Sequence, residues 1–173
     1  MGTDAINATR LLDILSTRTS RFFLEELGIA AEEAEREIED AQKLNLRSLT
    51  SIMGASGELR LYLAYSFDEP LINRAFEAYA SDIEVAEDER DLFVEETAAE
   101  IINIIAGNAL ADYNLEGPVI SLSPPIIISE AKHLMRHKSA KFSSARLVTE
   151  HGDLNIHLIG PKHLFDQRLE YKE

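Results

Sequence analysis

The longest apolar pattern in the sequence runs from Asp88 to Tyr113 and predicts a single long helix. The predicted helix begins with the acidic residues from Glu87 to Glu89. Carboxylates interact favourably with the exposed N–H groups and the positive dipole end at the start of a helix. In the middle of the segment, apolar residues cover most of the helix circumference. We therefore expect neighbouring elements to pack on several sides of this helix. The apolar residues are Ile101, Ile102, Ile104, Ile105, Ala106, Ala109 and Leu110.

A narrow polar stripe interrupts this apolar surface. Glu96, Glu100, Asn103 and Gly107 follow one another at steps of four, three and four, which places them on one helix face. An amide at Asn103, between pairs of isoleucines, is unfavourable for helix propensity and for packing. Gly107 costs about 1 kcal/mol relative to alanine in a helix interior, so we expect a packing or access reason for it. The stripe is a solvated helix face, a buried amide satisfied by a loop carbonyl, or a surface kept open to a partner.

Two segments before this helix are also helical in pattern. Residues from Ala5 to Leu27 have apolar side chains at helical spacing and end at Gly28, which predicts a core helix. Residues from Ala31 to Lys43 have high helix propensity but few apolar anchors. This composition predicts a solvent-facing helix.

Elsewhere the apolar period changes to two, which is typical of strands. The segments from Leu46 to Ser66 and from Ser143 to Gly160 each predict a strand, a turn and a strand, and the region from Val119 to Ser129 predicts two short strands broken at Pro124 and Pro125. Two more helices are expected. One is capped by Ser66 or Asp68 and has Pro70 in its first turn, and a short one runs from His163 to about Tyr171.

Residues 57–63 and 152–158 resemble each other. Both have a turn glycine, then an acidic residue, then Leu or Ile at the same alternate positions, and a helical pattern follows each. The match is either a duplicated half or convergence between hairpins. A duplication predicts an α/β (α+β) fold, with one mixed or antiparallel sheet packed under the long helix. We expect a single domain over 1–173, with a helical segment at 1–45 and the repeat-containing core at 46–173.

Composition narrows the possible functions. The net charge of −14 and the sequence pI near 4.7 argue against binding to nucleic acid or to anionic membranes. The sequence has no 18-residue apolar run and no secretory pattern at its start, so we expect no membrane span and, in a bacterium, a cytoplasmic location. The absence of cysteine removes disulfides, thiol catalysis and thiolate zinc sites.

Besides the polar stripe, the sequence offers one other candidate functional site, a metal site at His133 and His137. Their spacing of four would put both imidazoles on one face if that piece were helical, with Glu130 as the nearby third ligand. Lys132 and Arg136 make the segment cationic before any metal binds. The alternative is a solvated basic turn, or a patch that an acidic protein partner could use.

The stretch from Thr50 to Ile128 resembles the CheX/CheC family of chemotaxis phosphatases. The resemblance rests on Glu100-Ile-Ile-Asn103, on the Ala-Gly107-Asn108 that follows, on Pro125 and on the preceding glycine-turn hairpin and helix. It implies an internally pseudo-symmetric CheC/CheX-like fold. It covers about residues 46 to 160.

The resemblance also implies a function in chemotaxis and two-component signalling. The substrate would be the aspartyl phosphate of a CheY-type receiver domain, and the reaction its hydrolysis. Asn103 would orient a water in line with phosphorus, and Glu100 would pair with the active-site lysine of the receiver. Glu96, Gly107 and Asn108 would support this pair. The chain would need no cofactor of its own, because the receiver supplies Mg²⁺.

This sequence differs from some members of the CheX/CheC family in two features. The family tends to have Asp or Ser four residues before the glutamate, where this sequence has Glu96. Residues 5–27 contain no second Glu-x-x-Asn, so the resemblance implies a one-site, CheX-like protein that pairs as a homodimer through its sheet. The alternative function is a non-catalytic module that binds receivers, like the related flagellar switch proteins.

Overall fold

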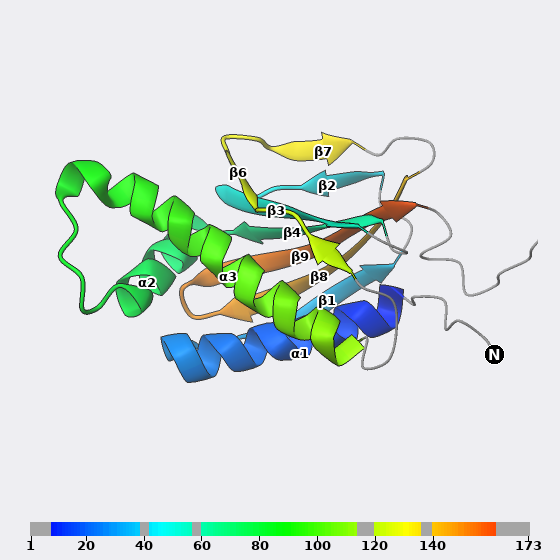
Figure 1. Cartoon of the computed structure of the whole chain (residues 1–173), viewed down its shortest axis with the longest axis horizontal. Helices are drawn as coiled ribbons and strands as arrows, with labels where there is room; N and C mark the ends of the chain where they lie inside the picture. Colours follow the sequence, from blue (N-terminus) through cyan, green and yellow to red (C-terminus); the bar gives the residue numbers. More distant parts are fainter. Residues whose placement is uncertain (1–7, 39–41, 57–59, 114–119, 136–139, 162–173) are drawn as a thin grey trace, which may run out of the picture.

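Three helices cover one face of an antiparallel sheet in the computed structural model, which describes residues 8–38, 42–56, 60–113, 120–135 and 140–161 (Figure 1). The helices are α1 (Ala8–Leu27), α2 (Glu69–Tyr79) and α3 (Arg90–Tyr113), and a single 3-10 turn, η1 (Glu87–Glu89), leads into α3. The three helix predictions for these parts of the chain are confirmed. None of these helices is long and apolar enough to cross a membrane.

The main sheet has seven strands, and every neighbouring pair is antiparallel. Its order is β1 (Glu32–Ile38), β8 (Ala140–Thr149), β9 (Gly152–Pro161), β4 (Leu61–Phe67) and β3 (Leu49–Ser56). The short strands β5 (Ser121–Leu122) and β6 (Ile126–Ser129) both pair with β3, on either side of the two prolines. A separate two-stranded sheet joins β2 (Lys43–Asn45) to β7 (His133–Met135). The predicted hairpins and the proline-broken strands are confirmed.

The core lies between the helices and the central strands β4 and β9. Alternate residues of these strands, such as Leu63, Tyr65, Ile156 and Leu158, are buried in one cluster with the apolar faces of the helices. Thr19 of α1 joins this core through a 2.7 Å hydrogen bond between its hydroxyl and the Tyr65 hydroxyl. Burial raises the pKa of the Tyr65 hydroxyl, so it remains a neutral partner in that bond.

The two resembling stretches meet at the centre of the sheet. β4 and β9 are neighbours, and their register places Leu63 directly opposite Leu158. These two leucines occupy the same position, six residues after Gly57 and Gly152 respectively. A local two-fold relation between the two strands would bring equivalent residues together in this way. The expected second helix of the repeat, from His163 to about Tyr171, lies outside the described residues.

The helix predicted from Ala31 to Lys43 is wrong. Residues 32–38 form β1, an edge strand that pairs with β8, and residues 43–45 form β2. The glutamates of β1 stand out into solvent on both sides of the strand, and Arg146 of β8 pairs with Glu35 at 3.1 Å. Pairing with a distant strand therefore outweighs the local helix propensity of this segment.

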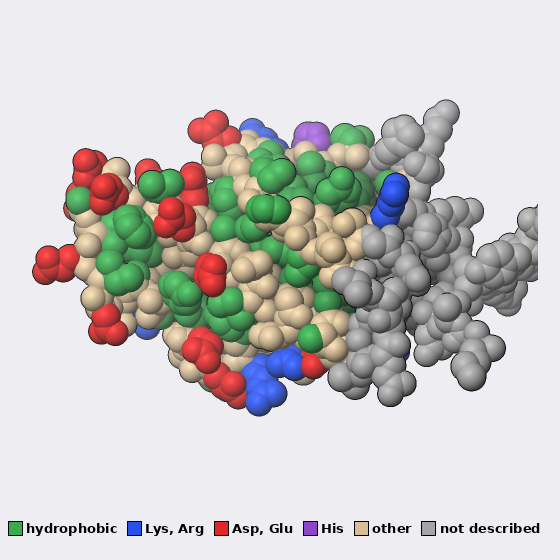
Figure 2. Space-filling model, viewed as in Figure 1, with side chains coloured by type: hydrophobic (Ala, Val, Ile, Leu, Met, Phe, Trp, Pro, Cys, Tyr) green, Lys and Arg blue, Asp and Glu red, His purple; other side chains and the backbone are tan. Residues whose placement is uncertain are grey.

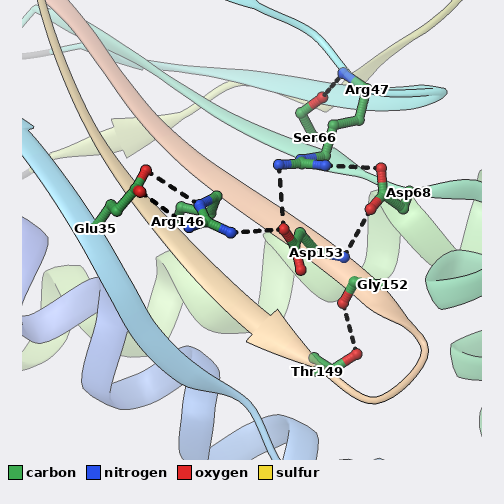
Figure 3. A network of polar contacts seen from close by, with 8 residues as sticks. All are labelled: Glu35, Arg47, Ser66, Asp68, Arg146, Thr149, Gly152 and Asp153. Carbon is green, nitrogen blue, oxygen red and sulfur yellow. Dashed lines mark hydrogen bonds and ion pairs between the residues drawn. The ribbon is translucent and has the colours of Figure 1, made fainter.

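A polar network fixes one end of the sheet to the start of α2 (Figure 3). Asp68 occupies the N-cap position, but its side chain does not cap the helix. It accepts a 2.8 Å hydrogen bond from the Asp153 backbone N–H and a second, also 2.8 Å, from Arg47. Arg146 in turn donates to the Asp153 carboxylate at 2.9 Å. These contacts hold the β8–β9 hairpin against the loop that precedes β3.

Candidate functional site

The polar stripe of α3 lies on the surface. Glu96, Glu100, Asn103 and Gly107 are exposed, whereas the intervening Ile102 and its apolar neighbours are buried. The buried-amide interpretation of Asn103 is therefore wrong. Because the opposite side of α3 is buried in the core, the exposed face is held in a fixed position.

The side chains of Glu100 and Asn103 make no hydrogen bond or ion pair with any part of the chain that the structure describes. A partner would not have to break an internal contact in order to reach them. At Gly107, a Cβ atom would meet no other atom within 4 Å. Packing therefore does not require glycine here, and the space beside Asn103 is open.

Leu92 extends the stripe toward the N-terminus of α3. It lies one turn before Glu96 and is 56% exposed. From Leu92 to Gly107 the stripe is about 22 Å long, at 1.5 Å per residue.

A groove of about 430 Å³ lies beside the stripe, between α1 and α3. Ile104 and Asn108 follow Glu100 at successive steps of four, so this row leads from the stripe into the groove. The residues that line the groove are Arg18, Arg21, Phe22, Glu25, Glu26, Tyr79, Ile104, Ile105 and Asn108.

Arginines of α1 flank the C-terminal half of α3. Arg18 donates from Nε and Nη2 to the two carboxylate oxygens of Asp112, at 2.5 and 2.6 Å. The hydrogen bond from Arg18 lowers the pKa of the Asp112 carboxyl. Near the start of α1, the Arg10 guanidinium lies 4.9 Å from the centre of the ring of Tyr113, the last residue of α3. These contacts clamp the two helices together. Arg18 and Arg21 line the groove together with Glu25 and Glu26, and each arginine is paired with a carboxylate.

Charge is unevenly distributed around α3. Figure 2 shows acidic side chains over α2 and the start of α3, and basic side chains with acidic ones beside them at the lower edge, over α1. The acidic end includes Glu87, Asp88, Glu89 and Asp91, which are all exposed. Lys132 lies in a different groove, with Arg47 and Asp68. Arg136 is outside the described residues.

The helix that the alternative metal site assumed is contradicted at His133. His133 lies in the strand β7, so the helical spacing argument does not apply, and His137 is outside the described residues. Among the described residues, no group of three or more His, Asp or Glu side chains could hold a metal ion. The stripe itself offers the carboxylates of Glu96 and Glu100, which can bind a cation of a partner, and the amide of Asn103, which can orient a water.

Sequence reasoning missed the groove and its arginines. Arg10, Arg18 and Arg21 fall within one face of the first helix, at steps of eight and three. That spacing is a visible signal, but it does not reveal which helix lies beside it. Arg18 contacts Asp112 across 94 residues of sequence.

The fold is that of a two-layer α+β protein that exposes Glu100 and Asn103 on one face of a long helix. The sequence matches the family described as Chemotaxis phosphatase CheX over residues 49–146, which is more than half of the chain. The protein belongs to this family. A comparison of the sequence with curated proteins finds no match.

Solved structures agree with this assignment at the level of the fold. A putative chemotaxis protein from Desulfovibrio vulgaris Hildenborough is 14% identical with a TM-score of 0.75, over 88% of this chain and 97% of that one. CheX from Vibrio vulnificus is 16% identical with a TM-score of 0.70, over 86% and 97%. CheX in the CheX–CheY–BeF₃–Mg²⁺ complex from Borrelia burgdorferi is 19% identical with a TM-score of 0.67, over 92% and 98%.

Proposed function

We propose that this protein hydrolyses the aspartyl phosphate of a CheY-type receiver domain in the cytoplasm. One observation carries the proposal: Glu100 and Asn103 are exposed and unpartnered among the described residues, on one face of a helix that is otherwise packed. Membership of the chemotaxis phosphatase family and the CheY bound to the Borrelia protein support the choice of substrate.

Asn103 positions the attacking water in this mechanism. Its side-chain amide accepts and donates hydrogen bonds, so it can hold a water in line with the phosphorus atom. The water oxygen forms a bond to phosphorus while the bond to the aspartyl oxygen breaks, which yields inorganic phosphate and a free carboxylate. Phosphoryl transfer needs little covalent help, so positioning supplies much of the acceleration.

Glu100 fixes the receiver relative to Asn103. It lies one helical turn before Asn103 on the same face, so it can pair with the active-site lysine of the receiver while the amide reaches the phosphoryl group. Glu96 continues this acidic surface, and Gly107 and Asn108 leave room beside the amide. The metal ion that the reaction needs is the Mg²⁺ of the receiver, so the chain needs no metal site of its own.

The face of the sheet away from the helices is our proposed surface for a homodimer. Tyr62 and Ile126 point to that face, because they alternate with residues of the helix-covered core. They are 58% and 66% exposed, and they lie on β4 and β6, the two strands that flank this part of β3. Sedimentation of Tyr62→Glu should show monomer if this face joins two copies, and an unchanged mass would place the dimer contact elsewhere.

The deciding experiment follows loss of the phosphoryl group from a phosphorylated CheY-type receiver, with and without this protein. We expect acceleration that Asn103→Ala abolishes while receiver binding stays measurable. Asn73→Ala removes a half-buried amide from α2, where the side chain donates to the Glu69 carbonyl, and is the control, which should keep full activity. Receiver binding without any acceleration by the unmodified protein would favour the flagellar-switch-like binding module instead.

A further inference from the structure

The exposed face of α3 continues past Glu100 and Asn103 toward the start of the helix, where it carries Leu92. Resting on the proposed phosphatase function, we propose that Leu92 is a docking residue for the receiver, and that it packs into an apolar patch with a cationic rim on the receiver surface. Glu100 and Asn103 alone do not define on which side of the pair the rest of the receiver lies.

Alignment along the helix is the first step. Leu92 and Asn103 are separated by about three helical turns, at 3.6 residues per turn, so the two side chains lie almost in line. The distance between them along the helix axis is about 16 Å, at 1.5 Å per residue. Glu96 and Glu100 lie between them on the same face. A receiver that reaches Asn103 can therefore also cover Leu92.

Exposure of an apolar side chain is the second step. Val94 belongs to the core and Phe93 packs against it, whereas Leu92 lies outside the core and is 56% exposed. A single exposed leucine is ordinary on a protein surface, but this one lies on the face that carries the proposed reacting pair. Covering it with an apolar patch of the receiver would remove its surface from water and favour association.

The opposite end of the same helix offers no comparable contact. A specific interface buries about 800 Å² on each partner, so the receiver must contact more than the reacting pair. After Gly107, the exposed residues of α3 are Asn108, Ala111 and Asp112, and the last of these is paired with Arg18. Interfaces have apolar centres and polar rims. The exposed leucine therefore favours a receiver that extends toward the N-terminus of α3.

Charge around Leu92 defines the rim of the complementary patch. Asp91 and Glu96 are exposed, and within the described residues their carboxylates make no hydrogen bond or ion pair. Arg90, the cation next to them, is paired with Glu77 of α2 at 3.3 Å. A partner that buried the two free carboxylates without supplying cations would lose affinity, because their hydration would not be replaced. The patch that receives Leu92 is therefore edged by lysine or arginine.

The test measures hydrolysis and binding with a CheY-type receiver from the same organism. Binding uses the receiver loaded with beryllofluoride and Mg²⁺, so that no turnover occurs. Leu92→Glu should raise KM and the dissociation constant about tenfold or more, because a carboxylate replaces the apolar contact. A glutamate in the first turn of a helix is favourable, so α3 should still form. The kcat should stay within about twofold, because the contact is the same in the bound substrate and in the transition state.

Three smaller changes separate a local effect from a general one. Leu92→Ala should raise the dissociation constant about fivefold, whereas Leu92→Met keeps the apolar contact and should stay within about twofold of the unmodified protein. Leu24→Ala is the matched control. Leu24 lies on α1 and is 60% exposed, and its truncation should leave the dissociation constant within about twofold. Both alanine variants should unfold at the same urea concentration as the unmodified protein, because both leucines are exposed.

Ionic strength tests the cationic rim. The dissociation constant of the unmodified protein should rise with added salt, because salt screens the attraction between the carboxylates of α3 and the cations of the receiver. Asp91→Asn removes one of these carboxylates and should make the rise smaller. An unchanged salt dependence in this variant would overturn the rim.

The outcomes distinguish the docking role of Leu92 from the proposed function. Equal dissociation constants for Leu92→Ala and Leu24→Ala, in a protein whose hydrolysis depends on Asn103, would overturn the docking role and leave the phosphatase proposal in place. Full activity in Asn103→Ala would overturn the proposed mechanism, and the dissociation constants of the leucine variants would then decide the docking role alone. No binding of the receiver to the unmodified protein would overturn both.

Discussion

The two long helices, α1 with 20 residues and α3 with 24, pack on the same face of the sheet and against each other. Polar side chains of α1 are largely engaged inside the molecule: Thr19 bonds to Tyr65, and Arg18 bonds to Asp112. The Glu100 and Asn103 side chains of α3 have no such partner among the described residues. A polar group with an internal partner stabilises the fold, whereas an exposed one without a partner is available to another molecule. The four predictions that follow test this division.

The largest effect is expected at Asn103. Asn103→Ala should lower kcat for receiver dephosphorylation by about 100-fold or more, because the attacking water loses its positioning group. Its free energy of unfolding should change by less than about 0.5 kcal/mol, because the side chain is exposed and makes no described contact. Phosphate release and urea unfolding measure the two quantities. A large loss of stability together with activity would show that Asn103 belongs to the fold.

The next effect concerns a polar group that is buried. His157 of β9 is 3% exposed, and its Nδ1 lies 2.6 Å from the Ser144 hydroxyl. Burial, with a smaller contribution from the Arg47 guanidinium, lowers the pKa of His157 from 6.5 to about 4.

Acid should therefore destabilise the fold through His157. His157 takes up a proton near pH 6.5 in the unfolded chain but only near pH 4 in the folded chain. Its effect on the free energy of unfolding is therefore absent above pH 6.5, and the free energy of unfolding falls as the pH drops toward 4. The loss is about 3 kcal/mol for a shift of this size. The free energy of unfolding of the unmodified protein and of His157→Asn, measured at several pH values, separates the effect of His157 from that of the carboxylates. Parallel curves for the two proteins would contradict the assignment.

A smaller loss is expected at Thr19. Thr19→Val keeps the shape of the side chain but leaves the buried Tyr65 hydroxyl without its partner, which should cost about 2 kcal/mol of unfolding free energy. The kcat of the folded protein should be unchanged, which is the opposite of the result at Asn103. Thermal unfolding and the phosphatase assay at a temperature well below the transition give the comparison. A fall in kcat without a fall in stability would remove the distinction between the helices.

The smallest effect is expected at Gly107. Because a Cβ atom would meet nothing within 4 Å, Gly107→Ala should stabilise α3 by about 0.5 to 1 kcal/mol. If the glycine provides clearance for the receiver, the same variant should raise the receiver dissociation constant a few-fold. Calorimetric titration with the beryllofluoride-loaded receiver measures this. Unchanged affinity would leave Gly107 without a role in docking.

Strongly periodic segments could be predicted from sequence alone. The pattern around Ile101 and Ile105 requires neighbours on several sides, and the structure supplies α1, α2 and the sheet. The spacing of Glu100 and Asn103 placed both on one face. Their exposure did not follow from spacing, because a buried amide fits the same pattern and only the packed structure separates the two cases.

The failures arise where distant parts of the chain decide the outcome. Residues 32–38 read as a charged helix, and only pairing with β8, more than 100 residues later, makes them a strand. The groove depends in the same way on contact between α1 and α3. The local composition of a segment does not reveal which distant segment it contacts. Neither the pairing of β1 with β8 nor the contact between α1 and α3 could therefore be predicted without the tertiary structure.

The acidic edge strand β1 has a consequence for the behaviour of the protein at high concentration. An uncovered strand edge is a template for uncontrolled growth of a sheet, and like charges along it prevent another edge from approaching. Glu32, Glu35 and Glu37 are exposed along β1, and a register shift between Glu33 and Glu35 further disturbs its regular spacing. Neutralising these glutamates would make β1 the place where aggregation into β-rich fibrils begins.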